Sequence, residues 1–156
     1  MVVMNEIFSA HKAIVRRMEQ RDAPEVSLLI QQLGYERSEG EVSRWIRLFA
    51  AEEERQTAFV ACLGETVVGW IEVSIERRLQ SPPFALIGGL VVKEGVRGNG
   101  IGRQLCQAAE AWSRKRQVST LRVTSRSTRL DAHRFYTGSG YQLVKVSQVF
   151  EKKLPS

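Results

Sequence analysis

Four glycines lie within one short stretch of this chain, at positions 95, 98, 100 and 102, between an apolar run and an amphipathic pattern. The apolar run, Ala85–Val92, predicts a strand, and the helical spacing of the apolar residues after Gly100 predicts a helix. A loop without Cβ atoms lets a ligand approach the backbone, and the N–H groups of the first helical turn point toward it. Because the helix dipole favours negative charge there, and the loop carries Arg97 and Arg103, the stretch predicts a pyrophosphate site.

The spacing of these glycines excludes two common phosphate-binding loops. The dinucleotide fingerprint needs G-x-G-x-x-G, whereas this loop reads G-x-G-x-G, and no Gly-Lys-Ser/Thr ending follows it. What remains is Arg97-x-x-Gly100-x-Gly102 after the strand residues Leu90–Val92. This pattern resembles the acetyl-CoA motif of the GNAT (Gcn5-related) N-acetyltransferase superfamily. A glycine-rich turn without a ligand is the alternative.

A second segment resembles the same family. Residues 129–141 read RLDAHRFYTGSGY, similar to the family's Asn/Arg-x-x-Ala-x-x-Phe-Tyr-x-x-x-Gly-Phe/Tyr signature. The resemblance implies one α/β (α+β) domain over residues 1–156, with residues 1–12 as a loose arm. Its fold would be a mixed, mostly antiparallel seven-stranded sheet with helices on both faces, in the order β-α-α-β-β-β-α-β-α-β-β.

The periodicity of the chain gives the same order of elements. Strands are expected at Ala13–Met18, Gln56–Leu63, Thr66–Ile75, Ala85–Val92, Val118–Ser125, Tyr141–Val146 and Ser147–Leu154. Helices are expected from an Asp22 N-cap to Gly34, over Ser38–Ala51, from Gly100 onward and over Leu130–Thr137. Glu76–Pro83 is expected to be a polar loop. Gly88 and Gly89, inside a strand, indicate a bulge or a close approach to the backbone.

Composition narrows the class of protein only slightly. The net charge of +6 is compatible with an anionic cofactor, but the basic residues are scattered, so a nucleic-acid-binding module is the weaker alternative. The two cysteines are far apart and form no CxxC pair, so neither a disulfide framework nor a metal site is expected. No apolar run is long enough to span a membrane, and a cytoplasmic location is expected.

The resemblance also implies which residues hold the cosubstrate, acetyl-CoA. In the family, the pantetheine arm fills a gap beside the central strand, which implies backbone contacts from Leu90, Val91 and Val92. One backbone N–H there would polarise the thioester carbonyl. The pyrophosphate contacts implied are those of Arg97, Gly98, Asn99, Gly100, Ile101, Gly102 and Arg103. Ser125 and Arg129 are further candidates for cofactor contact, with a solvated loop as their alternative.

Two residues are candidates for proton transfer. Tyr136 matches the family tyrosine that faces the cofactor sulfur, and a phenol, with a pKa near 10, can donate a proton to a departing thiolate. Its alternative is packing beside Phe135. An attacking ammonium must first lose a proton, yet the strand position that carries a carboxylate in many relatives is Gly88 here. Glu72, on the preceding strand, is the candidate substitute, and a half-exposed surface glutamate is the alternative.

The sequence therefore predicts an acetyl-CoA-dependent N-acetyltransferase of the acyltransferase class. A primary amine, on a small molecule such as an aminoglycoside or on a peptide, would attack the thioester directly. No metal, nucleic acid or membrane is expected to take part, and the resemblance implies a homodimer as one arrangement. The alternative within the same fold is a non-catalytic, acyl-CoA-binding regulatory domain.

Overall fold

The structure is a computed structural model that describes residues 12–156. The arm expected over residues 1–12 lies, except for Lys12, outside this range. The chain forms two compact units, Met1–Val123 and Thr124–Ser156, and each is described by itself.

The first unit is built on a five-stranded sheet whose strands follow one another in chain order. Neighbouring strands pair antiparallel from β1 to β4, and β4 pairs parallel with β5. The mixed, mostly antiparallel sheet is therefore confirmed. Its strands are β1 (Ile14–Arg17), β2 (Gln56–Leu63), β3 (Thr66–Arg78), β4 (Ser81–Val92) and β5 (Leu121–Val123).

The expectation of seven strands is wrong. The segments Tyr141–Val146 and Ser147–Leu154 carry a strand-like pattern, but among residues 12–156 neither pairs with another strand. The element order is as expected up to the last helix and departs from it afterwards. A strand needs a neighbour for its backbone hydrogen bonds, and an apolar, β-branched pattern does not supply one.

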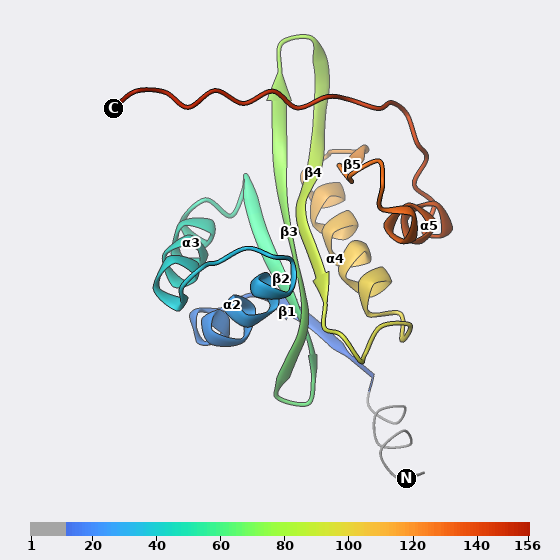
Figure 1. The fold of residues 1–156 in the computed structure, drawn as a ribbon. Coiled ribbons are helices and arrows are strands. Elements are labelled where there is room, and N and C mark those ends of the chain that lie inside the picture. The colour runs from blue at the N-terminus through green and yellow to red at the C-terminus, as the bar shows by residue number, and fades with distance from the viewer. Residues whose placement is uncertain (1–11) are drawn as a thin grey trace. The chain divides into compact units, whose positions relative to one another are not determined.

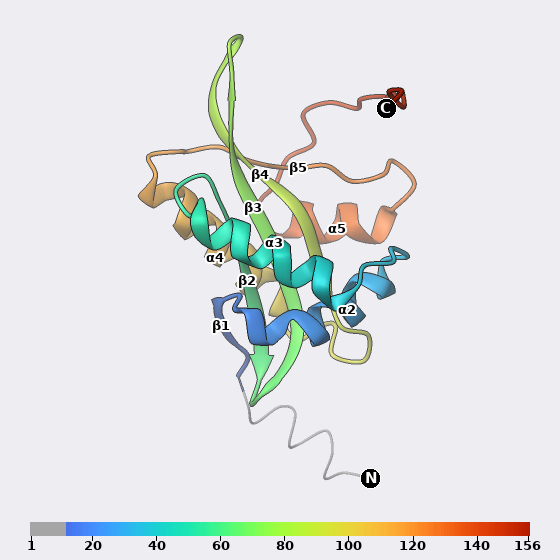
Figure 2. The same cartoon turned by 90° about the vertical axis from the view of Figure 1, so that its left-hand side faces the viewer.

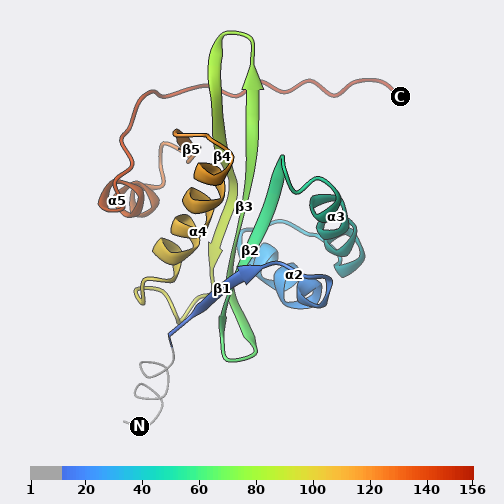
Figure 3. The same ribbon diagram turned by 180° about the vertical axis from the view of Figure 1, so that it is seen from behind.

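Helices cover both faces of the sheet, as expected. Figures 1 and 3 show α2 (Ala23–Gln32) and α3 (Glu39–Ala51) on one face and α4 (Ile101–Lys115) on the other. A short 3-10 turn, η1 (Gln20–Asp22), precedes α2. The second unit contains α5 (Leu130–Gly138) followed by an extended segment.

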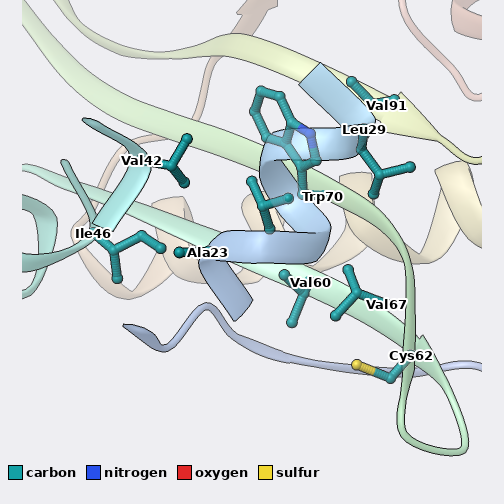
Figure 4. Packing of buried hydrophobic residues seen from close by; sticks show 10 residues of the cluster. Ala23, Leu29, Val42, Ile46, Val60, Cys62, Val67, Trp70 and Val91 are labelled. Atoms are coloured by element: carbon teal, nitrogen blue, oxygen red, sulfur yellow. The ribbon is translucent and has the colours of Figure 1, made fainter. Parts of the chain in front are cut away.

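The two faces of β3 separate two layers of core. Trp70 packs with Val60 and Val91 under α2 and α3, in the cluster drawn in Figure 4. On the opposite face, the space above Gly69 is filled by Leu105 of α4, whose Cδ1 would lie 3.1 Å from a Cβ at that position. Side chains alternate along a strand, so Glu72 shares the face of Trp70.

Asp22 is not the side-chain N-cap that its position suggested. Its carboxylate accepts hydrogen bonds from Arg16, at 2.7 and 2.8 Å, and from the backbone N–H of Glu19 at 2.8 Å. No capping bond to α2 is made. Ser38 does cap α3, accepting from the N–H of Glu41 at 3.2 Å.

The loop expected over Glu76–Pro83 is also wrong. β3 and β4 continue into this segment and pair as far as Arg78 and Ser81, leaving only a tight turn between them. The register shifts between Glu76 and Arg78, and Pro82 and Pro83 are exposed, so the prolines lie where a missing N–H is least costly. Figure 2 shows this ribbon rising beyond α3 and α4.

Candidate active site

A β-bulge interrupts β4 at the double glycine. Glu72 of β3 pairs with Gly89, and the next residue, Val73, pairs with Ile87, so Gly88 is the extra residue. This finding confirms the prediction that Gly88 and Gly89 mark a bulge or a close approach to the backbone. Both glycines lie beneath side chains of β3: a Cβ at Gly88 would approach the Glu72 carboxylate to 2.9 Å, and one at Gly89 would approach Trp70 to 2.6 Å.

Beyond the bulge, β4 pairs with no strand of residues 12–156 on the side of β5. The parallel pairing with β5 covers only Ala85, Leu86 and Ile87, because β5 is shorter than the expected Val118–Ser125. The N–H of Lys93 donates to the carbonyl of Val68 on β3 at 2.7 Å. By alternation, residues 91 and 93 face β3, and the backbones of residues 90 and 92 face the unpaired side.

The three residues expected to contact the cosubstrate, Leu90, Val91 and Val92, therefore do not all face the open side. Leu90 and Val92 present backbone groups to the open side, whereas Val91 pairs with Trp70 of β3 and its side chain is buried. The carbonyl of Val92 already accepts from Gln32 Nε2 at 3.0 Å and Arg97 Nε at 3.3 Å. A ligand strand along this edge would thus find the N–H of Val92 and both groups of Leu90.

Gln32 is a site residue that the sequence analysis missed. Its amide donates to the carbonyl of Val92 and accepts from the N–H of Glu94 at 3.0 Å. The last turn of α2 thereby holds the junction between strand and loop. Nothing in the sequence relates a glutamine at this helix end to a strand 60 residues later, so no local signal could have found it.

The loop that follows is shaped to leave its backbone accessible. Gly95, Gly98 and Gly100 have φ angles of +88°, +88° and +75°, and a Cβ at any of them would meet no atom within 4 Å. These left-handed conformations explain the choice of glycine. Two side chains close the loop on itself, Arg97 onto Val92 and Asn99 onto the carbonyl of Val96 at 3.1 Å.

The N-terminus of α4 lacks the groups that normally neutralise a helix start. No side chain of the described residues, 12–156, caps it at Gly100, and its first turn carries no acid. By contrast, α3 has the Ser38 cap and two glutamates in its first turn. The first helical turn, with exposed Arg97 and Arg103 nearby in the chain, therefore suits an anion.

Glu72 lies partly buried without a hydrogen-bond donor among residues 12–156. Burial raises the pKa of its carboxyl group, and no other group contributes. Structural acids in partly buried positions are normally paired, as Asp22 is with Arg16. A half-buried carboxylate with no partner, over a bare backbone, is better suited to receive a proton than to stabilise the fold.

The other predicted residues lie in the second unit. Tyr136, on α5, packs edge-on against Phe135 and Tyr141, with ring centroids 5.2 and 5.7 Å away. The Ser125 hydroxyl is buried with no hydrogen-bond partner among residues 12–156, and Arg129 is exposed immediately before α5.

His133, also on α5, is not available as a base through its Nε2 atom. This atom lies 2.8 Å from the carbonyl of Arg126, so it carries the proton and donates it. The histidine therefore fastens the preceding loop to α5.

Residues 12–156 contain no group of three or more His, Cys, Asp and Glu side chains placed to hold a metal ion. No helix in this part of the chain combines the length and the apolar character needed to cross a membrane.

Comparisons with known proteins agree with the two motifs. The model of the acetyltransferase (GNAT) family matches residues 15–141. An aminoglycoside N(6')-acetyltransferase type 1 from Stenotrophomonas maltophilia is 32% identical over 90 residues, which are 54% of this chain and 58% of that protein. The alignment thus spans little more than half of that relative.

Solved structures share the fold at low identity. Aminoglycoside 6'-N-acetyltransferase AAC(6')-Ih from Acinetobacter baumannii matches with a TM-score of 0.79 and 15% identity, covering 92% of this chain and 100% of that one. Aminoglycoside N-acetyltransferase AAC(6')-Iy in complex with CoA matches with a TM-score of 0.77 and 16% identity, covering 92% and 97%.

Proposed function

Because this chain belongs to the acetyltransferase (GNAT) family, whose cosubstrate is acetyl-CoA, we propose that it transfers the acetyl group of acetyl-CoA to a primary amine. The observation that carries the proposal is the unpaired edge of β4 beyond Ile87, which runs directly into the uncapped N-terminus of α4. An amide-containing arm can pair with such an edge, and a pyrophosphate suits the helix start.

Backbone groups supply most of the binding in this proposal. Leu90 and the N–H of Val92 bind the pantetheine amides, and the amides of residues 97–103 bind the pyrophosphate. Gln32 keeps the end of β4 aligned with the loop. A backbone N–H of β4 stabilises the oxyanion that develops on the thioester carbonyl, which is worth about 3–4 kcal/mol in comparable sites. Ser125 and Arg129 are proposed as further contacts.

Two side chains move protons. Glu72 accepts a proton from the attacking ammonium, directly or through a water molecule, so that the amine gains a lone pair. Because burial raises the pKa of Glu72, this pKa lies closer to neutral pH than that of an ordinary glutamate, which makes the carboxylate a stronger base. Tyr136 donates its phenolic proton to the departing CoA thiolate, and the second proton, which the nitrogen loses as the amide forms, returns through water to the Tyr136 phenolate. In this scheme the amine attacks the thioester carbonyl directly and the CoA sulfur leaves, so no covalent intermediate forms on the enzyme.

The acceptor that we propose is an aminoglycoside-like polyamine. The relatives described above are aminoglycoside acetyltransferases. On the face of the sheet that carries Glu72, the turn between α2 and α3 forms an open hollow of about 690 Å³ lined by Tyr35, Glu36 and Glu41, among others. Arg37 neutralises Glu41 at 2.9 Å, and Glu36 has no ionic partner among residues 12–156, which suits a cationic substrate.

Thermal unfolding with acetyl-CoA, CoA and an adenine nucleotide lacking pantetheine tests the cosubstrate site. A ligand at 100 times its dissociation constant stabilises a protein by about 2.7 kcal/mol, so acetyl-CoA and CoA should raise the melting temperature clearly. No shift at millimolar acetyl-CoA would remove the proposal. CoA release with neamine or kanamycin as acceptor then tests the amine.

Turnover of the unaltered protein separates an enzyme from a regulatory domain, and Tyr136→Phe tests the role of the tyrosine. A catalytic domain should lose turnover about 10²-fold or more and keep the thermal shift with CoA. A regulatory domain would show no turnover in the unaltered protein either, while still binding acetyl-CoA.

We also propose that the chain forms a homodimer through its C-terminal segment. Six apolar side chains there are between 74 and 88% exposed: Leu143, Val144, Val146, Val149, Phe150 and Leu154. An extended apolar segment without a partner strand is suited to pair with a second copy. Light scattering should give twice the chain mass for the unaltered protein and the monomer mass after Val146→Asp and Phe150→Asp.

A further inference from the structure

Trp70 and Glu72 meet above one glycine. They are two residues apart on β3, on the same face, and lie opposite Val91 and Gly89 of β4. A Cβ at Gly89 would lie 2.6 Å from Cη2 and 2.9 Å from Cζ3 of Trp70, and 3.4 Å from Oε1 of Glu72. The outer edge of the indole and the carboxylate therefore lie side by side over the same few backbone atoms.

This arrangement depends on two missing side chains. The bulge places the potential Cβ positions of Gly88 and Gly89 both toward β3's side chains, where Glu72 fills one space and Trp70 the other. With an alanine at either position, one of the two side chains would have to move. The double glycine is thus matched to this particular pair.

Trp70 is held by apolar packing. It is 8% exposed and belongs to the cluster with Leu29 and Val42, among which its indole stands in Figure 4. Its Nε1 atom is buried and has no hydrogen-bond partner among residues 12–156. What the ring offers to Glu72 is consequently a fixed apolar wall.

No charged group in the described part of the chain acts on the Glu72 carboxylate beside this indole. Burial is the one cause of the raised pKa of Glu72, and no ionisable group in the described part of the chain contributes to it. Across the sheet, Glu72 is opposite Ala58 on β2 and Gly89 on β4. Along β3, the hydroxyl of Ser74 is engaged with Glu76 at 3.0 Å. Among these neighbours on β2, β3 and β4, the indole edge is the large apolar group beside the carboxylate.

We infer that Trp70 is a positioning residue for Glu72, whose indole edge holds the carboxylate above Gly88 and excludes water from one side of it. The inference rests on the proposed function for its consequence in catalysis, and it stands on the geometry of β3 and β4 for its structural part. Phenylalanine at position 70 is shorter and does not reach the place of Cη2, so it would leave space for water beside Glu72.

The test compares Trp70→Phe with Trp112→Phe as a matched control. Trp112, on α4, is 7% exposed and also has a buried, unpartnered Nε1 atom, but it lies on the opposite face of the sheet. Carbon-13 NMR titration of labelled glutamate carboxyls, with Glu72→Gln to assign the signal, measures the pKa of Glu72 without cosubstrate or turnover. The pH dependence of kcat/KM is recorded in parallel.

In the unaltered protein and in Trp112→Phe, Glu72 should titrate above an ordinary glutamate. In Trp70→Phe its pKa should fall by at least about half a unit, and the acidic limb of kcat/KM should move to lower pH by the same amount. An unchanged Glu72 pKa in Trp70→Phe overturns the inference. If the NMR shift occurs but no variant acetylates any amine, the proposed function fails while the positioning of Glu72 stands.

Discussion

The carboxylate of Glu72 occupies the space that a side chain at position 88 would need, since a Cβ on Gly88 would lie 2.9 Å from Oε1 and 3.2 Å from Cδ. Gly88→Ala should therefore displace the carboxylate. Because Glu72 is a flexible side chain, the free energy of unfolding should change by less than about 1 kcal/mol, while turnover falls about tenfold or more.

Gly40→Ala is the matched control for this substitution. Gly40 lies in α3, and a Cβ there would meet only the Ser38 hydroxyl, at 3.9 Å. Kinetics and chemical denaturation of both variants check the prediction. Equal turnover in the two would show that Glu72 does not depend on the bare backbone at Gly88.

Glu72→Gln should separate activity from stability. Because burial raises the folded-state pKa of Glu72, the folded protein binds this proton more tightly than the unfolded chain does. The ionised carboxylate therefore costs stability once the pH rises above the unfolded value, near 4.3. Glu72→Gln should melt no lower than the unaltered protein at pH 7, yet lose most of its turnover. A clear drop in melting temperature at pH 7 would assign Glu72 a structural role.

Asp22 should behave in the opposite way. Burial alone would raise its pKa, but the hydrogen bonds from Arg16 and from the N–H of Glu19 outweigh it and lower the pKa. Its contribution to stability is present above the unfolded value, near 3.9, and is lost as the pH falls through the lower folded-state value. Asp22→Asn should cost about 2–3 kcal/mol at pH 7, because Arg16 loses its partner in a partly buried site.

Denaturant unfolding from pH 7 down to pH 2 measures this effect. The difference between Asp22→Asn and the unaltered protein should shrink on acidification. A difference that stays constant with pH would mean that the ion pair is not its source.

Gly98→Ala should weaken cosubstrate binding beyond its effect on stability. Gly98 has a φ of +88°, so a Cβ is strained there at a cost of about 1 kcal/mol even though the space is open. Gly64, in the β2–β3 turn, has a φ of +60° and the same open surroundings. Both alanine variants should lose similar stability, but only Gly98→Ala should bind acetyl-CoA more weakly by calorimetry. Equal affinities would take the loop out of the binding site.

Local signals predicted the elements whose stability is local. A helix forms over the segment expected at Ser38–Ala51, the glycine-rich stretch before α4 is a loop between a strand and a helix, and Gly88 marks a bulge. In each case the information lies within a few residues of the feature. The polar segment before Pro82 was misjudged because the pairing partner, rather than composition, extends β3 and β4 into a ribbon.

Features that depend on distant residues were not predictable. Asp22 has the position of an N-cap, but its carboxylate forms an ion pair with Arg16 on β1. Gln32 reaches a strand end 60 residues away. The bare backbone under Glu72 follows from cross-strand register, which periodicity does not fix. The sequence motif predicts where the cosubstrate loop lies, whereas register places the Glu72 carboxylate over Gly88 and Gly89.

The unpaired edge of β4 also bears on the tendency of the protein to aggregate when no cosubstrate is bound. The backbone groups of Leu90 and Val92 that we propose as cosubstrate contacts have no partner strand among residues 12–156, so another extended chain could pair with them, and exposed strand edges are the usual starting point of aggregation. A molecule lying along this edge would act as a temporary protective strand. Solutions of the protein kept with CoA should therefore stay clear on storage and heating for longer than solutions of the protein alone.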